Sequence, residues 1–181
     1  MQTVANLFEQ AQKVNRNDSE SFLTDRSKQK LREQWILGKF VDSYNKKTSV
    51  EKILYALPTE SPDFKLFDAD KRWLFDSEIT EALDEGRKRS DEIRIKSNNS
   101  SFIQDIDYVP VLDNLINSKC ARNYPNPTML IIYFNVFSSM YDDFDGITPI
   151  RFSNIHVPKK CNLTQIWIMD SGGDQIHRII K

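Results

Sequence analysis

The feature that constrains this chain most is an almost unbroken run of apolar and aromatic residues, MLIIYFNVF, at Met129 to Phe137. A strand with one face in water would carry polar residues at every second position. Continuous apolar sequence is instead typical of a strand that is buried on both faces. Such a strand lies at the centre of a sheet that helices cover on both sides. The run therefore predicts an α/β fold with 129–137 at its core.

The segments around this strand alternate between helix and strand patterns. Apolar residues at helical spacing, or closely spaced opposite charges, predict helices at 3–16, 24–46, 81–95 and 109–122. Runs bounded by turn residues predict strands at 50–57, 63–67, 72–80, 163–169 and 175–180, and an extended segment or short helix at 150–158. We expect one domain over 1–181, a central mixed β-sheet flanked by helices, with 1–24 as an N-terminal helical extension.

Composition limits the classes of protein to consider. Hydrophobic residues make up 39% and charged residues 28% of 181 residues, as in ordinary globular proteins. The net charge of −1 argues against a uniformly basic surface but leaves room for a local basic face. Cys120 and Cys161 have no zinc-ligand spacing, which predicts buried free thiols. No run of about 18 apolar residues occurs, so we expect no membrane span and a cytoplasmic location.

Two carboxylates stand on neighbouring predicted strands. Asp63 follows Pro62 at the start of one strand, and Glu78 lies on the more polar face of the next, beyond a turn-like segment at 68–71. Taken singly, each residue is more commonly structural. In combination they predict a site for a hard cation such as Mg²⁺, with the backbone carbonyl of Ile79 as a further ligand. A cation bound in this way assists phosphodiester hydrolysis.

The sequence Pro62-Asp63, followed on the next strand by Glu78-Ile79-Thr80, resembles the PD-(D/E)xK nuclease superfamily, which has the restriction-endonuclease-like fold. The resemblance covers about residues 25 to 180 and includes the order of the predicted elements. It implies that Asp63 and Glu78 hold Mg²⁺ or Mn²⁺ in a metal-dependent nuclease. It also implies nucleic acid as the partner, DNA rather than RNA, and a homodimer, because cutting a duplex requires two active sites.

One position departs from the superfamily pattern. Thr80 stands where those nucleases carry a lysine that orients or activates the attacking water. A lysine from another element would then have to replace it. Lys119, near the end of the predicted helix 109–122, is our preferred candidate, and Lys65 and Lys88 are weaker ones.

An N-terminal helix of the superfamily often contributes a further acid. We assign this auxiliary role to Glu33 rather than Glu51, because Glu33 lies in the long helix that precedes the sheet. The missing lysine and the near-neutral net charge keep a second hypothesis open. On that hypothesis the chain is a catalytically inactive protein of the same fold that binds a partner or regulates one.

Overall fold

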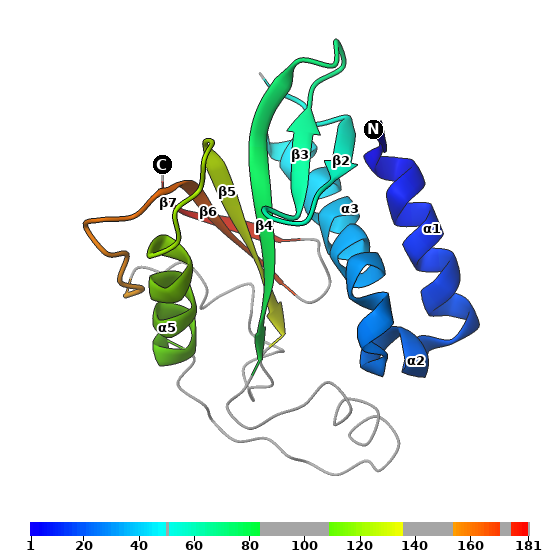
Figure 1. Cartoon of the computed structure of the whole chain (residues 1–181), viewed down its shortest axis with the longest axis horizontal. Coiled ribbons are helices and arrows are strands. Elements are labelled where there is room, and N and C mark those ends of the chain that lie inside the picture. Colours follow the sequence, from blue (N-terminus) through cyan, green and yellow to red (C-terminus); the bar gives the residue numbers. More distant parts are fainter. Residues whose placement is uncertain (50, 84–108, 136–153, 171–174, 181) are drawn as a thin grey trace.

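The computed structural model describes residues 1–49, 51–83, 109–135, 154–170 and 175–180, which form a seven-stranded mixed sheet flanked by helices (Figure 1). The strands are β1 (Gln2–Thr3), β2 (Tyr55–Pro58), β3 (Phe64–Phe67), β4 (Trp73–Leu83), β5 (Thr128–Asn135), β6 (Leu163–Met169) and β7 (Ile176–Ile180). The helices are α1 (Val4–Asn17), α2 (Ser19–Thr24), the 3₁₀ helix η1 (Arg26–Lys28), α3 (Gln29–Lys47) and α5 (Val109–Cys120). The predicted α/β class and central mixed sheet are confirmed. No helix within these ranges is long and apolar enough to cross a membrane.

The strands lie side by side in chain order from β1 to β7. Strands β1 to β4 pair antiparallel, β4, β5 and β6 are parallel, and β7 returns antiparallel to β6. α3 covers one face and α5 the other (Figure 1). Residues 129–132 of β5 are completely buried between these two layers. The prediction of a central strand is therefore confirmed for the described part of 129–137, and 136–137 lie outside it.

α1 packs closely on α3 at Gly38. A Cβ atom at Gly38 would lie 2.5 Å from the Cβ of Phe8, so only glycine permits this approach of the two helices. Before α1, the short strand β1 pairs with β2. Residues 1–24 thus contribute a strand to the sheet as well as the predicted helix.

Two predicted helix boundaries are wrong. The helix expected from Glu81 does not start there, because 81–83 continue β4 and pair with β5; residues 84–95 lie outside the described part. The helix expected from about Thr24 begins at Gln29. Asp25 accepts a hydrogen bond from the Ser27 amide and so caps a separate 3₁₀ turn. Of the segment 150–158, residues 154–158 form neither helix nor strand.

The prediction of free thiols is also wrong. Cys120 and Cys161 form a disulfide, with their Cα atoms 4.4 Å apart. Cys120 ends α5 shortly before β5, and Cys161 lies just before β6. Because β5 and β6 are parallel, both strands start at the same edge of the sheet and the two cysteines meet there. Beside the disulfide, Asn162 Nδ2 donates to the carbonyl of Arg122 at 2.9 Å.

Candidate functional site

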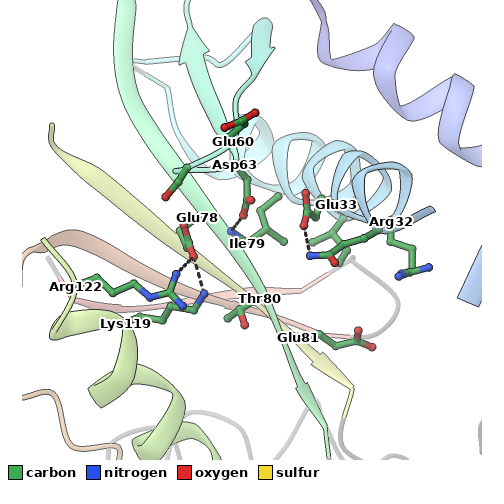
Figure 2. Close-up of a pocket in the computed structure, with 13 residues that line it drawn as sticks. Arg32, Glu33, Glu60, Asp63, Glu78, Ile79, Thr80, Glu81, Lys119 and Arg122 are labelled. Atoms are coloured by element: carbon green, nitrogen blue, oxygen red, sulfur yellow. Dashed lines mark hydrogen bonds and ion pairs between the residues drawn. The ribbon is translucent and has the colours of Figure 1, made fainter. Parts of the chain in front are cut away.

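A polar cavity of about 390 Å³ lies between α3, the start of β3, the middle of β4 and the end of α5 (Figure 2). Acidic side chains predominate on its walls. They are Glu33, Glu60, Asp63, Glu78 and Glu81, and the basic residues are Arg32, Lys119 and Arg122. The cavity thus collects carboxylates from α3, β4 and the turn before β3. Such a surplus of negative charge favours a bound cation.

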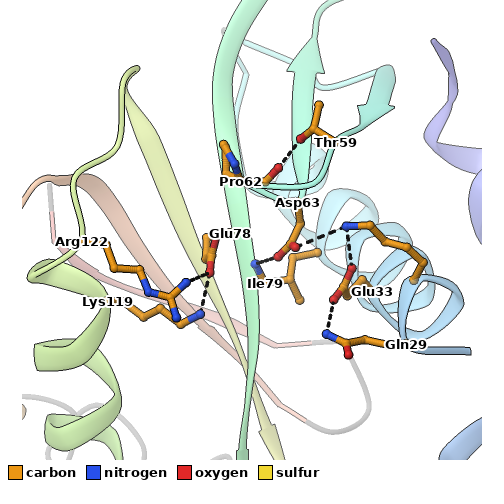
Figure 3. A network of polar contacts seen from close by, with 10 residues as sticks. Gln29, Glu33, Thr59, Pro62, Asp63, Glu78, Ile79, Lys119 and Arg122 are labelled. Atoms are coloured by element: carbon orange, nitrogen blue, oxygen red, sulfur yellow. Dashed lines mark hydrogen bonds and ion pairs between the residues drawn. The ribbon is translucent and has the colours of Figure 1, made fainter. Parts of the chain in front are cut away.

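A tight turn places Asp63 in this cavity. The Thr59 amide donates to the Asp63 carbonyl at 2.9 Å, and the Thr59 hydroxyl donates to the carbonyl of Pro62, which follows a cis peptide bond. Beyond the turn, β3 pairs antiparallel with β4. This pairing lets Asp63 Oδ2 accept a hydrogen bond from the Ile79 amide at 2.7 Å (Figure 3). Asp63 is therefore held against β4 one residue from Glu78.

The charge on Asp63 is unfavourable where it lies. Burial raises the pKa of its carboxyl above the ordinary value of 3.8. The hydrogen bond from Ile79 lowers the pKa, but the negative charges of Glu33 and Glu78 raise it further, and Lys30 offsets only part of this. The three carboxylates are thus close enough to repel one another. A divalent cation beside Asp63 would relieve that repulsion.

Glu78 is held by two cations. Its side chain is 7% exposed, and Oε1 lies 2.6 Å from Lys119 Nζ and 2.8 Å from Arg122 Nη1 (Figure 3). Lys119 is in the last turn of α5 and Arg122 follows it three residues later. Sequence reasoning selected Lys119 as the replacement lysine, and the structure places it in direct contact with the predicted second metal ligand.

Glu33 lies on the opposite wall of the cavity. Its Oε1 accepts a hydrogen bond from Gln29 at 2.9 Å, and its Oε2 lies 3.1 Å from Lys30 Nζ. Lys30 Nζ is also 3.4 Å from Asp63 Oδ1, so this ammonium joins the two acids. Burial lowers the pKa of Lys30, but the contacts with Glu33 and Asp63 raise it by more. Glu51 is exposed and does not line the cavity.

The motif position Thr80 and the two weaker lysine candidates lie in different places, and only Thr80 lines the cavity among those that the structure describes. Thr80 lines the cavity two residues after Glu78, so the position itself faces the site although its side chain carries no charge. Lys65 is in β3 and is not among the lining residues. Lys88 lies outside the residues that the structure describes.

Two of the cations that contact the predicted acids were not themselves predicted, Lys30 and Arg122. Both lie three positions from a predicted residue, Lys30 from Glu33 and Arg122 from Lys119. Residues three apart lie on the same side of a helix. This spacing was the available signal for Lys30, which shares α3 with Glu33, whereas Arg122 lies beyond the end of α5 in a turn in which its amide donates to the Lys119 carbonyl at 3.1 Å.

The donor atoms suit a divalent cation, but their present contacts are ion pairs. Within the described ranges, no three His, Cys, Asp or Glu side chains are grouped closely enough to hold a metal ion. Mg²⁺ needs only one or two protein carboxylates, because water and phosphate oxygens complete its octahedron. Asp63, Glu78 and the Ile79 carbonyl satisfy this requirement chemically. A cation binding there would compete with Lys30, Lys119 and Arg122 for the carboxylates.

Replacement of Asp63 by asparagine is expected to raise the melting temperature at pH 7. Because folding raises the pKa of Asp63, ionisation of this carboxyl destabilises the folded state at every pH above the raised pKa. The penalty disappears below the ordinary pKa of 3.8, where the wild-type side chain is also neutral. The difference in melting temperature between the variant and the wild type should therefore become smaller as the pH falls. Thermal unfolding between acidic and neutral pH measures this, and a lower melting temperature of the variant at pH 7 would contradict it.

Comparison of the chain with protein-family models, with curated proteins and with solved structures found no match. No relative therefore assigns a role to any residue of the cavity. Its chemistry follows from the residues that line it and from the contacts between them.

Proposed function

We propose that this chain is a metal-dependent nuclease that hydrolyses phosphodiester bonds, with DNA preferred to RNA. The observation that supports it most is that one polar cavity contains Asp63, Glu78 and Lys119, which come from three different elements. Glu33 lines the same cavity. The succession of α3, three antiparallel strands, α5 and a strand parallel to β4 supports the restriction-endonuclease-like fold as part of the proposal.

Each side chain has a distinct role in this proposal. Asp63 and Glu78, with the Ile79 carbonyl, would hold Mg²⁺ or Mn²⁺, and the bound ion would supply an activated water and positive charge for the phosphate. Lys119 Nζ offers a positive charge next to Glu78 and stabilises the charge that develops on the phosphoryl oxygens. Glu33 pairs with Lys30 and so keeps the Lys30 ammonium group beside Asp63. Lys119 thus takes over the charge that Thr80 lacks.

Incubation of the wild-type protein with supercoiled plasmid and with single-stranded DNA tests this proposal directly. We expect cleavage in Mg²⁺ or Mn²⁺ and none in a chelator. Cleavage on both strands further requires two sites, so we include a homodimer in the proposal, which light scattering after gel filtration checks. Absence of both cleavage and Mn²⁺ binding would refute the nuclease.

A metal ion and the two cationic side chains would compete for the carboxylate of Glu78. A metal ion at Glu78 would weaken the contacts of Lys119 and Arg122 with this carboxylate and free both side chains for phosphate oxygens. Arg122→Gln is therefore expected to bind Mn²⁺ several-fold more tightly without nucleic acid, yet to cleave more slowly. The variant should fold, because the Arg122 side chain is 53% exposed and Lys119 still pairs with Glu78.

Isothermal titration with Mn²⁺ measures this effect. Lys52→Gln is the matched control, since it removes one exposed positive charge outside the cavity. Weaker or unchanged Mn²⁺ binding by Arg122→Gln would show that Glu78 is no metal ligand. That result would favour the second candidate function, a catalytically inactive protein of this fold that binds a partner or regulates one. Two observations favour this second function: Lys119 and Arg122 both pair with Glu78, and Thr80 stands at the lysine position.

A further inference from the structure

Positive charge is concentrated next to the cavity, although the chain as a whole has a net charge of −1. The described residues of 114–135 and 154–169 contain no aspartate or glutamate. They do contain four basic residues. These are Lys119, Arg122, Lys159 and Lys160, which we call the basic ridge. These two segments thus carry only positive charge within a nearly neutral protein, and Glu78 from β4 pairs with two of their four cations.

Two contacts bring the halves of the basic ridge together. The disulfide joins Cys161, which directly follows Lys160, to Cys120, which directly follows Lys119. The Asn162 side chain donates to the Arg122 carbonyl at 2.9 Å. The segment 159–162 is therefore fastened along the end of α5, although about 40 residues separate the two in sequence.

The basic ridge has exposed members and members that line the cavity. Lys159, Lys160 and Arg122 are exposed, whereas Lys119 is mostly buried against Glu78. Lys119 and Arg122 are themselves cavity-lining residues (Figure 2). The acid nearest to the ridge on α5 is Asp113, six residues before Lys119, and it accepts a hydrogen bond from the His156 amide. A polyanion bound by Lys159, Lys160 and Arg122 together would extend from these exposed residues to the wall of the cavity.

We propose that the basic ridge binds the sugar–phosphate backbone of a nucleic acid and leads it into the cavity. This inference rests on the proposed function only for what happens at the cavity end. Lysine and arginine side chains contact phosphates without reading sequence, so binding should be strong at low salt and independent of sequence. A protein partner fits less well, because interface cores need large apolar side chains. Such residues are exposed elsewhere, at Met1, Leu54, Leu57 and Trp73.

Binding is measured by fluorescence anisotropy of a labelled DNA strand, single and duplex, in chelator over a series of salt concentrations. Lys159→Gln/Lys160→Gln is compared with Lys13→Gln/Lys52→Gln, a control that removes two exposed lysines outside the ridge and the cavity. For the ridge variant we expect affinity lower by on the order of tenfold. Its salt slope should be smaller by about 1.4 on the single strand and about 1.8 on the duplex. The control should match wild type.

Several results would refute the proposal that the basic ridge binds nucleic acid. These are absence of wild-type binding at low salt, an equal loss in ridge and control variants, or ridge-dependent binding to anionic phospholipid vesicles without binding to DNA. Because binding is measured without metal, it is independent of hydrolysis. Ridge-dependent binding of DNA with neither cleavage nor Mn²⁺ binding would refute the nuclease and support the proposed role of the ridge. If the ridge variant cleaves at the wild-type rate at low substrate concentration, that result would support the nuclease and refute the proposed role of the ridge.

Discussion

Asp63→Asn is expected to abolish metal-dependent cleavage of DNA, with a loss of about 10³-fold or more. Asparagine preserves the size of the side chain and an oxygen that accepts the hydrogen bond from the Ile79 amide. The fold around the turn should therefore be retained. What the variant loses is the negative charge, and with it the affinity for a divalent cation. The single-turnover cleavage rate and the Mn²⁺ affinity should fall together.

Glu51→Gln is the control for this experiment, because Glu51 is an exposed acid outside the cavity and the alternative to Glu33 in sequence. It should cleave at the wild-type rate. Glu78→Gln should lose as much activity as Asp63→Asn but should also melt at a lower temperature, because it leaves the largely buried Lys119 without its charged partner. Wild-type cleavage by Asp63→Asn would exclude this cavity as the metal site.

Removal of the disulfide by Cys120→Ser/Cys161→Ser is expected to lower the free energy of unfolding by about 4 kcal/mol. The cysteines are 41 residues apart, and a cross-link over such a loop restricts the unfolded chain by about this amount. Equilibrium unfolding in urea measures the difference. The end of α5 should also be less firmly held, so the double variant should bind DNA more weakly than wild type even where it is fully folded.

The wild-type protein treated with dithiothreitol is the control, and it should unfold at the same urea concentration as the double serine variant. Mass spectrometry after alkylation shows whether the purified protein carries the disulfide at all. Two alkylated cysteines in the untreated protein would contradict the pairing of Cys120 with Cys161. Disulfides persist in oxidising compartments and are rare in the cytosol. The same measurement on protein from its natural source therefore also tests the expected cytoplasmic location.

Much of the sheet was predictable because its signals are local. The run from Met129 is apolar on both faces, and this pattern alone indicated the central strand. Asp63 and Glu78 were chosen from the hairpin pattern, and Lys119 from its position near the end of a helix. The structure places all three at one cavity. The end of β4 was mistaken for a helix because charge spacing at Glu81 is local, whereas pairing with β5 is not.

What only the tertiary structure decided is which distant groups meet. Lys119 and Arg122 are each more than 40 residues from Glu78 in sequence, and the two cysteines are 41 residues apart, so no local pattern in the chain predicts these contacts. They exist because β4, β5 and β6 run parallel, which brings the end of α5 and the start of β6 to the same region of the sheet. The sequence by itself determined the central strand and the acids that a cation would need. The packing of α5 on the sheet determined that Glu78 is paired with Lys119 and Arg122, and the disulfide determined that Lys160 lies in a segment fastened to the end of α5.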